Sequence, residues 1–244
     1  IDVWFDSPTS GVVLVEAGDT LNIRDGVLAD IIGELDPTAG GVVTTGRSDG
    51  AAGTLWVEVL TGGRIGWVNS FYLTEEGDTP DEPELTTELA SFATSVFENG
   101  ELMGPHTGPK GLSVVHFDPT KWWSHDDDPM SDPTVYLWGS TGCGVDPGCA
   151  PQATFADQIA DGFLSAWNDD DRVIELNAPM AGGNGTLPEF VIPTPFRNFD
   201  YLAVHDPGDD PQYAGLDWVT WYVYFDMVDG LPTVVAFSVD MWAP

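Results

Sequence analysis

Runs of carboxylates and histidines are the residues whose types most readily suggest chemistry in this chain. The segments His125–Asp128, Asp169–Asp171 and His205–Asp210 hold the hard oxygen ligands that Ca²⁺ prefers. None has the alternating Asp-x-Asp-x-Asp-Gly spacing that directs successive carboxylates at one ion. Because the chain has 40 acidic residues, short runs arise readily, and solvated loops are the default interpretation. No cofactor is predicted, and Ca²⁺ stays a minor hypothesis with Asp126, Asp127 and Asp128 as its ligands.

Hydrolysis would need a serine, a histidine and an aspartate to converge, and the candidates are Ser140, His205 and Asp217. Ser140 lies in Gly-Ser-Thr-Gly-Cys, which lacks the Gly-x-Ser-x-Gly frame of a strained nucleophile turn. His205 follows an apolar strand, where a hydrogen-bonded structural histidine is the simpler interpretation. The sequence therefore leans against an enzyme, and a secreted hydrolase is kept as the alternative.

Aromatic rings beside carboxylates form a third constellation. Such surfaces stack on sugar rings and hold cations over ring faces. Most of these rings are expected in the core, but adjacent Trp122 and Trp123 in a polar loop cannot easily both be buried. The candidate ligand-binding residues are Trp122, Trp123, His205, Trp218, Tyr222 and Tyr224.

The stretch Leu216–Trp242 predicts one long β-hairpin that positions several of these rings. Two runs rich in Val, Trp, Tyr and Phe flank Asp229-Gly230, a pair that suits a tight hairpin turn. Alternation makes both faces of the hairpin apolar. Two helices would cover one face, so the other face is expected either to line a ligand pocket or to pack on the N-terminal domain.

The net charge and the length of the chain limit the functions that it can have. The 244 residues suffice for two modest domains, and 40 acidic against 7 basic residues give a formal net charge of -33. This field repels phosphate backbones and anionic lipids, so no nucleic-acid or membrane-surface partner is expected. An acidic, hydrated surface is typical of a high-salt environment, where counterions screen self-repulsion. No apolar run approaches the roughly 18 residues that span a bilayer, so the chain is expected not to be membrane-spanning.

Two cysteines suggest where the protein works. Cys143 and Cys149 lie in a loop rich in Gly and Pro that can bring the thiols together, which favours a disulfide. Two free thiols, or half of a metal site, are the alternatives. A disulfide implies an exported protein, so the expected location is secreted or on the cell surface.

Residues 1–74 read as short strands separated by turns, a pattern that indicates a small barrel. The predicted strands are Val12–Glu16, Leu21–Arg24, Ile31–Leu35, Val42–Thr45, Leu55–Leu60 and Ile65–Val68, and the predicted barrel core is Leu21, Ile23, Ile32, Leu35, Val57, Val59 and Val68.

Four stretches that overlap these strands carry a resemblance to a known family. They are Leu21–Arg24, Ile32–Leu35, Trp56–Val59 and Gly66–Leu73. Their order and spacing resemble a bacterial SH3 domain from end to end. The resemblance implies an SH3-like barrel that anchors an exported protein to peptidoglycan or presents another domain at the cell wall. It implies no catalysis. A structural spacer barrel that packs on its neighbour is the alternative.

Residues 75–84 read as an acidic inter-domain linker, and residues 85–244 as a second domain. Apolar residues at helical spacing predict helices over Leu85–Asn99 and Phe155–Trp167. A curved antiparallel sheet with two helices on one face is an α+β domain, like cystatin-like or NTF2-like folds. Asp132–Ser140 and Asp210–Trp218 resemble an uncharacterised domain found behind SH3 modules in exported bacterial proteins.

Together these features predict a non-catalytic, exported cell-surface protein. Its SH3-like barrel would attach to the wall or a partner, and its α+β domain would bind a cell-wall component, a glycan, a protein partner or a small ligand. Besides the hydrolase, a structural subunit of a surface assembly is the remaining alternative.

Overall fold

The structure is a computed structural model that describes residues 9–77, 80–115, 121–138, 152–180, 190–208, 210–213 and 215–241. Strand is the main regular structure of the described residues, which form a curled antiparallel sheet and few helices. Contacts divide the chain into two compact units. The first unit is Ile1–Pro80, Ile192–Phe199 and Asp226–Pro232, and the second is Asp81–Val191, Asp200–Phe225 and Thr233–Pro244.

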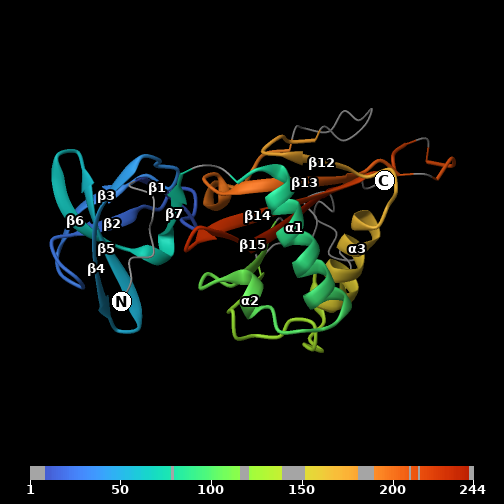
Figure 1. Cartoon of the computed structure of the whole chain (residues 1–244), viewed down its shortest axis with the longest axis horizontal. Helices are drawn as coiled ribbons and strands as arrows, with labels where there is room; N and C mark the ends of the chain where they lie inside the picture. The colour runs from blue at the N-terminus through green and yellow to red at the C-terminus, as the bar shows by residue number, and fades with distance from the viewer. Residues whose placement is uncertain are drawn as a thin grey trace. The chain divides into compact units, whose positions relative to one another are not determined.

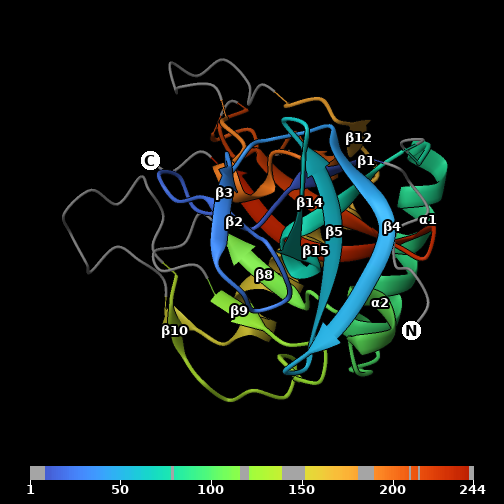
Figure 2. The same ribbon diagram turned by 90° about the vertical axis from the view of Figure 1, so that its left-hand side faces the viewer.

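The first unit is built on a seven-stranded sheet in the order β3-β2-β6-β5-β4-β1-β7, whose pairs are antiparallel. Figures 1 and 2 show how its strands curl. The strands are β1 Thr9–Val12, β2 Leu21–Arg24, β3 Ile31–Leu35, β4 Val42–Ala51, β5 Thr54–Thr61, β6 Arg64–Asn69 and β7 Leu73–Glu76, with a 3₁₀ turn η1 over Ser70–Tyr72. Four of the six predicted strands are confirmed within a residue at each end. The first is wrong by about three residues, and the fourth continues to Ala51.

The core of the first unit follows the alternation along its strands. Leu21 and Ile23 of β2 and Val57 and Val59 of β5 point inward. Six of the seven predicted core residues belong to this buried cluster, and the seventh, Ile32, is partly buried and packs against it. Gly66 has no side chain because a Cβ there would meet Ile23 and lie 2.9 Å from the carbonyl oxygen of Arg24.

Two segments from late in the sequence complete the first unit. Leu14 donates its backbone N–H to the carbonyl of Pro195 at 2.7 Å, beside the short turn η4 over Thr194–Phe196. The Asn198 amide donates to the carbonyl of Val12 at 2.8 Å. The Thr74 hydroxyl donates to the buried carboxylate of Asp226 at 2.8 Å. Residues 192–199 and 226–232 therefore supply backbone and side-chain partners for β1 and β7.

The second unit is built on a six-stranded sheet in the order β12-β13-β14-β15-β8-β9. Its strands are β8 Leu112–Val115, β9 Lys121–Trp123, β12 Val173–Leu176, β13 Asp200–Asp206, β14 Val219–Val228 and β15 Leu231–Met241, and a separate pair is β10 Tyr136–Leu137 with β11 Gln152–Ala153. The predicted curved antiparallel sheet is confirmed with one exception, since β8 pairs in parallel with β15. The chain between Val115 of β8 and Leu231 of β15 supplies the long connection that parallel neighbours require.

The long hairpin is confirmed as β14 and β15. Asp229 and Gly230 at its turn have φ angles of 53° and 74°, the positive values that a two-residue turn of this kind demands. The apolar run on both sides of the turn forms the two central strands of the second sheet. Turn chemistry and alternation therefore define this element from sequence alone.

Helices cover one face of the second sheet. They are α1 Glu82–Phe92, continued by a wider turn η2 over Ala93–Glu98, α2 Gly104–Thr107, and α3 Asp161–Trp167, preceded by η3 over Ala156–Ala160. Helix α1 begins before its predicted start because Asp81 caps it, accepting a hydrogen bond from the backbone of Glu84 at 2.9 Å. The acidic stretch outside regular structure is thus shorter than residues 75–84, since β7 reaches Glu76. No helix among the described residues is long and apolar enough to cross a membrane.

Candidate functional site

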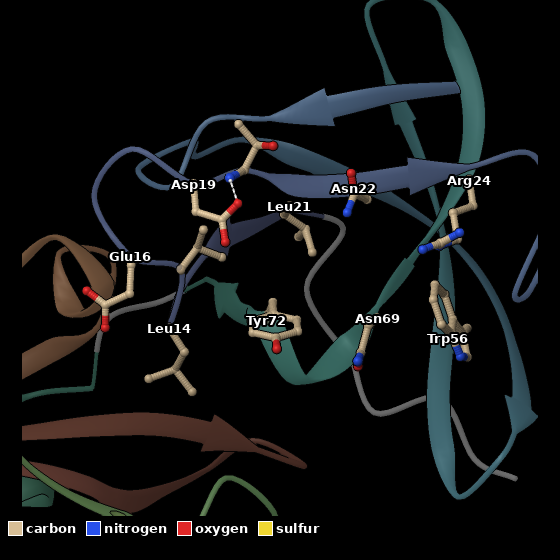
Figure 3. Close-up of a pocket in the computed structure, with 11 residues that line it drawn as sticks. Leu14, Glu16, Asp19, Leu21, Asn22, Arg24, Trp56, Asn69 and Tyr72 are labelled. Carbon is tan, nitrogen blue, oxygen red and sulfur yellow. Dashed lines mark hydrogen bonds between the residues drawn. The ribbon is translucent and has the colours of Figure 1, made fainter. Parts of the chain in front are cut away.

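A groove of about 470 Å³ lies in the first unit, within the range typical of ligand sites. It is formed by the loop after β1, by β2, and by the ends of β5 and β6 with the turn η1 (Figure 3). Its lining residues are Leu14, Val15, Glu16, Asp19, Thr20, Leu21, Asn22, Arg24, Trp56, Asn69 and Tyr72.

Strand alternation brings the polar lining residues to one face. Asn22 and Arg24 alternate with the core residues Leu21 and Ile23 along β2. Trp56 of β5 lies directly opposite Asn69 of β6 in the sheet register. Strand β2 and the strands β5 and β6, which lie about 30 or more positions later in the sequence, thus meet at the groove.

The turn η1 positions Tyr72. The Asn69 carbonyl oxygen Oδ1 accepts a hydrogen bond from the backbone N–H of Phe71 at 2.9 Å and caps this turn. Its Nδ2 is then left as a donor. No hydrogen bond joins the Asn22 amide or the Tyr72 hydroxyl to another residue in the described part of the chain. The groove therefore presents polar groups that a ligand can engage.

The loop after β1 carries backbone strain at the rim of the groove. Leu14 has a φ of 58°, a left-handed conformation uncommon for a residue with a side chain. Its N–H is held by Pro195, and the neighbouring Val13 donates to the carbonyl of Tyr72 at 3.0 Å. Strain of this kind persists where surrounding contacts over-determine the conformation, and it gathers at ligand sites.

The groove has opposite charges at its two ends. Figure 3 places Glu16 and Asp19 at one end and Arg24 with Trp56 at the other. The Arg24 guanidinium lies 6.0 Å from the centre of the Trp56 ring, and its Nη1 donates to the carbonyl of Ala29 at 2.6 Å. The Trp56 side chain is 7% exposed, and its indole N–H has no hydrogen-bond partner among the described residues.

The chemistry of the lining favours binding. It contains no histidine, cysteine or serine, so it offers no pair of a nucleophile with a histidine base. It does offer carboxylates, a guanidinium, two amides and a phenol within one cavity. That combination suits recognition of a polar ligand with charges of both signs.

The aromatic residues expected to bind a ligand on the long hairpin are covered. Tyr222 and Tyr224 are fully buried, and Trp218 is 3% exposed. The Phe190 ring stacks on the Tyr222 ring, with centroids 3.7 Å apart. The Tyr222 hydroxyl donates to the carbonyl of Met180 at 3.3 Å. Met180 and Phe190 thus lie against this face of the second sheet.

Burial also changes the acidity of these phenols. It raises the pKa of Tyr222 and of Tyr224 well above the ordinary range, and it raises the pKa of Tyr201 beside them. The three rings lie together, with the Tyr201 centroid 5.9 Å from each of the other two. The neutral phenols are therefore part of a packed layer.

His205 has a hydrogen-bonded structural setting. Its Nδ1 lies 2.8 Å from the Thr220 hydroxyl, and burial lowers its pKa. Asp217 Oδ2 instead accepts the backbone N–H of Asp210 at 2.8 Å. No hydrogen bond or ion pair joins His205 to Asp217 in the described ranges. Ser140, the third candidate of the hydrolase hypothesis, lies outside the described residues.

Trp122 and Trp123 point to opposite sides of β9. Trp123 is 7% exposed and packs on Phe155, with centroids 4.9 Å apart. Trp122 is 53% exposed, and its indole donates to the carbonyl of Lys110 at 2.8 Å. The expectation that the two are not both buried is confirmed. Strands β15 and β8 separate β9 from β14, so the structure does not bring this pair to Tyr222, although it does place Trp218 beside His205.

The acidic run at Asp126–Asp128 is used in local turns. Asp127 accepts the backbone N–H of Ser124 at 2.7 Å, and Asp128 accepts the hydroxyl of Ser131 at 2.6 Å. Among the residues that the structure describes, no three Asp, Glu, His or Cys side chains gather as a metal site. The predicted disulfide partners, Cys143 and Cys149, lie outside the described residues.

Comparison with protein-family models, with curated proteins and with solved structures gave no match. The candidate site therefore stands on its geometry.

Sequence reasoning about chemistry missed the groove residues, although a signal for them was present. Asn22, Arg24, Trp56, Asn69 and Tyr72 all lie in the stretches that carry the bacterial SH3 resemblance. Alternation along β2 already directs Asn22 and Arg24 away from the core. The signal was the set of polar residues on the outward side of the predicted strands.

Proposed function

We propose that this chain is a non-catalytic protein of the cell surface, either secreted or held at the envelope. Its first unit would be a bacterial SH3-like module for attachment to a cell-wall component or a partner. Its second unit would be an α+β domain of cystatin-like or NTF2-like type that binds a protein partner, a glycan or a small ligand. The short antiparallel strands and their core support the first part, because they fall on the stretches that carry the resemblance.

The groove carries this proposal. It gathers Arg24, Trp56 and Tyr72 with two amides, and these side chains come from three separate stretches of the resemblance. Small polar polymers of the wall, which contain peptide and sugar, are recognised by aromatic rings together with a few directed polar groups. Attachment through the groove would leave the second unit to its own partner.

A sedimentation experiment tests the proposal. The full chain is mixed with purified cell-wall sacculi in about 1 M salt, where the Debye length of roughly 3 Å suppresses repulsion between the acidic protein and anionic wall polymers. The wild-type chain is expected to pellet with the sacculi. Arg24→Gln is expected to weaken the association by about five- to tenfold, the scale of one charge-assisted contact that stays partly exposed to solvent.

Arg64→Gln is the matched control, because Arg64 starts β6 in the same sheet and is exposed, but does not line the groove. It makes the same charge change and is expected to leave sedimentation unaltered. Wild-type chain that stays in the supernatant would contradict wall attachment. Equal loss in both variants would show that net charge, rather than the groove, governs the association.

A further inference from the structure

We infer that the groove of the first unit recognises a short peptide at both of its charged ends, with an ammonium group at Glu16 and Asp19 and a carboxylate at Arg24. This inference rests on the proposed function, because it names the chemical class of ligand that the same groove takes. It assigns an orientation, in which the amino end lies at the loop after β1 and the carboxyl end lies over β2 and β5.

The two ends of the groove differ in charge and in the elements that supply them. Glu16 and Asp19 lie in the loop between β1 and β2, and the carboxylate of Glu16 has no hydrogen bond to another described residue. Arg24 is fixed from two sides, by the Ala29 carbonyl and by the Trp56 ring. One Nη1 hydrogen bond leaves most of the five guanidinium N–H groups for a ligand carboxylate.

The middle of the groove suits a peptide backbone. Leu21 and Tyr72 lie between the two charged ends in Figure 3. The Asn22 amide can both donate and accept, and the Nδ2 of Asn69 can donate, because only its Oδ1 is engaged. Peptide groups present one donor and one acceptor for each residue, so two amides beside apolar side chains match an extended chain.

Net charge selects among ligands. Two carboxylates and one guanidinium give the lining a charge of about -1, within a chain of formal net charge -33. An anion would meet repulsion on approach from every side. A peptide with free ends is neutral as a whole, and each of its charged groups finds the opposite charge within the groove.

Titration calorimetry of the full chain with trialanine tests this orientation, using N-acetyl-trialanine and trialaninamide as the two end-blocked probes. Wild-type chain is expected to bind trialanine about five- to tenfold more tightly than either blocked probe, the value of one partly exposed charge-assisted contact. Asp19→Asn is expected to weaken the binding of trialanine and of trialaninamide, but to leave the binding of N-acetyl-trialanine unchanged. Arg24→Gln is expected to weaken the binding of trialanine and of N-acetyl-trialanine, but to leave the binding of trialaninamide unchanged.

Two control variants make the same charge changes in the first unit away from the groove. They are Asp229→Asn, which keeps the Asn-Gly type of hairpin turn, and Arg64→Gln. Both are expected to bind all three probes as wild type does, and circular dichroism of each variant checks its fold. Because the two groove variants act on opposite ends, misfolding of one still leaves the other as a test.

Equal binding of the three probes would overturn the inference, as would the absence of trialanine binding at about 10 mM, a concentration above that expected for weak ligands of this size. If trialanine does not bind while Arg24→Gln still weakens sedimentation on sacculi, the ligand class is wrong and the proposed attachment stands. If trialanine does not bind and Arg24→Gln leaves sedimentation unchanged, the groove does not serve attachment.

Discussion

The covered tyrosine layer of the second sheet predicts how the protein responds to alkali. Tyr222 and Tyr224 are fully buried, and that burial raises both pKa values well above the ordinary value of about 10. The folded chain keeps these phenols protonated at a pH where the unfolded chain releases the protons. A raised folded pKa contributes stability that is fully present below pH 10 and is lost as pH rises further.

The size of the effect follows from proton linkage. Each phenol that stays protonated only in the folded state lowers the free energy of unfolding by about 1.4 kcal/mol for each pH unit above its unfolded pKa. For Tyr222 and Tyr224 together the loss reaches about 4 kcal/mol near pH 11.5. That is comparable with the total stability of many domains, roughly 5–15 kcal/mol, so the second unit is expected to unfold in this range.

Absorbance at 295 nm and circular dichroism, followed together through a pH titration, give the readout. Ionisation of the buried phenols is expected to coincide with loss of the near-ultraviolet signal. Tyr222→Phe removes one linked proton and should reduce the pH dependence of unfolding by about a third to a half. Tyr213→Phe is the control, since Tyr213 is 44% exposed. Complete ionisation of all six tyrosines near pH 10 in a chain that stays folded would refute the reasoning.

Three further predictions concern stability. Melting temperature should rise by several degrees from about 0.01 M to about 1 M salt, because screening relieves the repulsion of a net charge of -33, and a flat profile would exclude this effect. Gly66→Ala should cost about 1–3 kcal/mol in urea unfolding, since its Cβ would meet Ile23 and the Arg24 carbonyl, whereas Gly26→Ala, with its nearest neighbour at 3.4 Å, should cost less. Thr74→Val should cost about 1–3 kcal/mol by removing a donor to buried Asp226, and an unchanged midpoint would contradict that contact.

Elements with strong local signals were predictable from the sequence. The Asp229-Gly230 turn and the alternation beside it define the long hairpin. The helix predicted over Phe155–Trp167 has a local start signal, since the Asp157 N–H donates to the Thr154 hydroxyl at 3.2 Å. The inward residues of β2 and β5 were also predictable, because alternation assigns them without knowledge of the partners. These features depend on neighbours within a few positions.

Features that depend on distant partners were not predictable in the same way. Strand β7 extends through Glu75 and Glu76, which the sequence analysis assigned to the linker. The local sequence gives no sign of this strand, because its partner β1 lies about 65 residues earlier. The parallel pairing of β8 with β15 joins residues more than 100 positions apart. The cover over Tyr222 comes from Phe190, in a segment without periodicity. The groove combines a loop with three strands, so only the fold assembles it.

Chemical-shift mapping with soluble cell-wall fragments tests the central claim most directly. The assigned indole N–H resonances of Trp56, Trp122 and Trp218 report on three separate places, and Trp56→Phe identifies the first of them. Attachment through the groove predicts that the Trp56 resonance and the Asn22 and Asn69 side-chain amides shift, while Trp122 and Trp218 do not. Shifts confined to Trp122 or Trp218 would contradict the account and place the binding surface in the second unit.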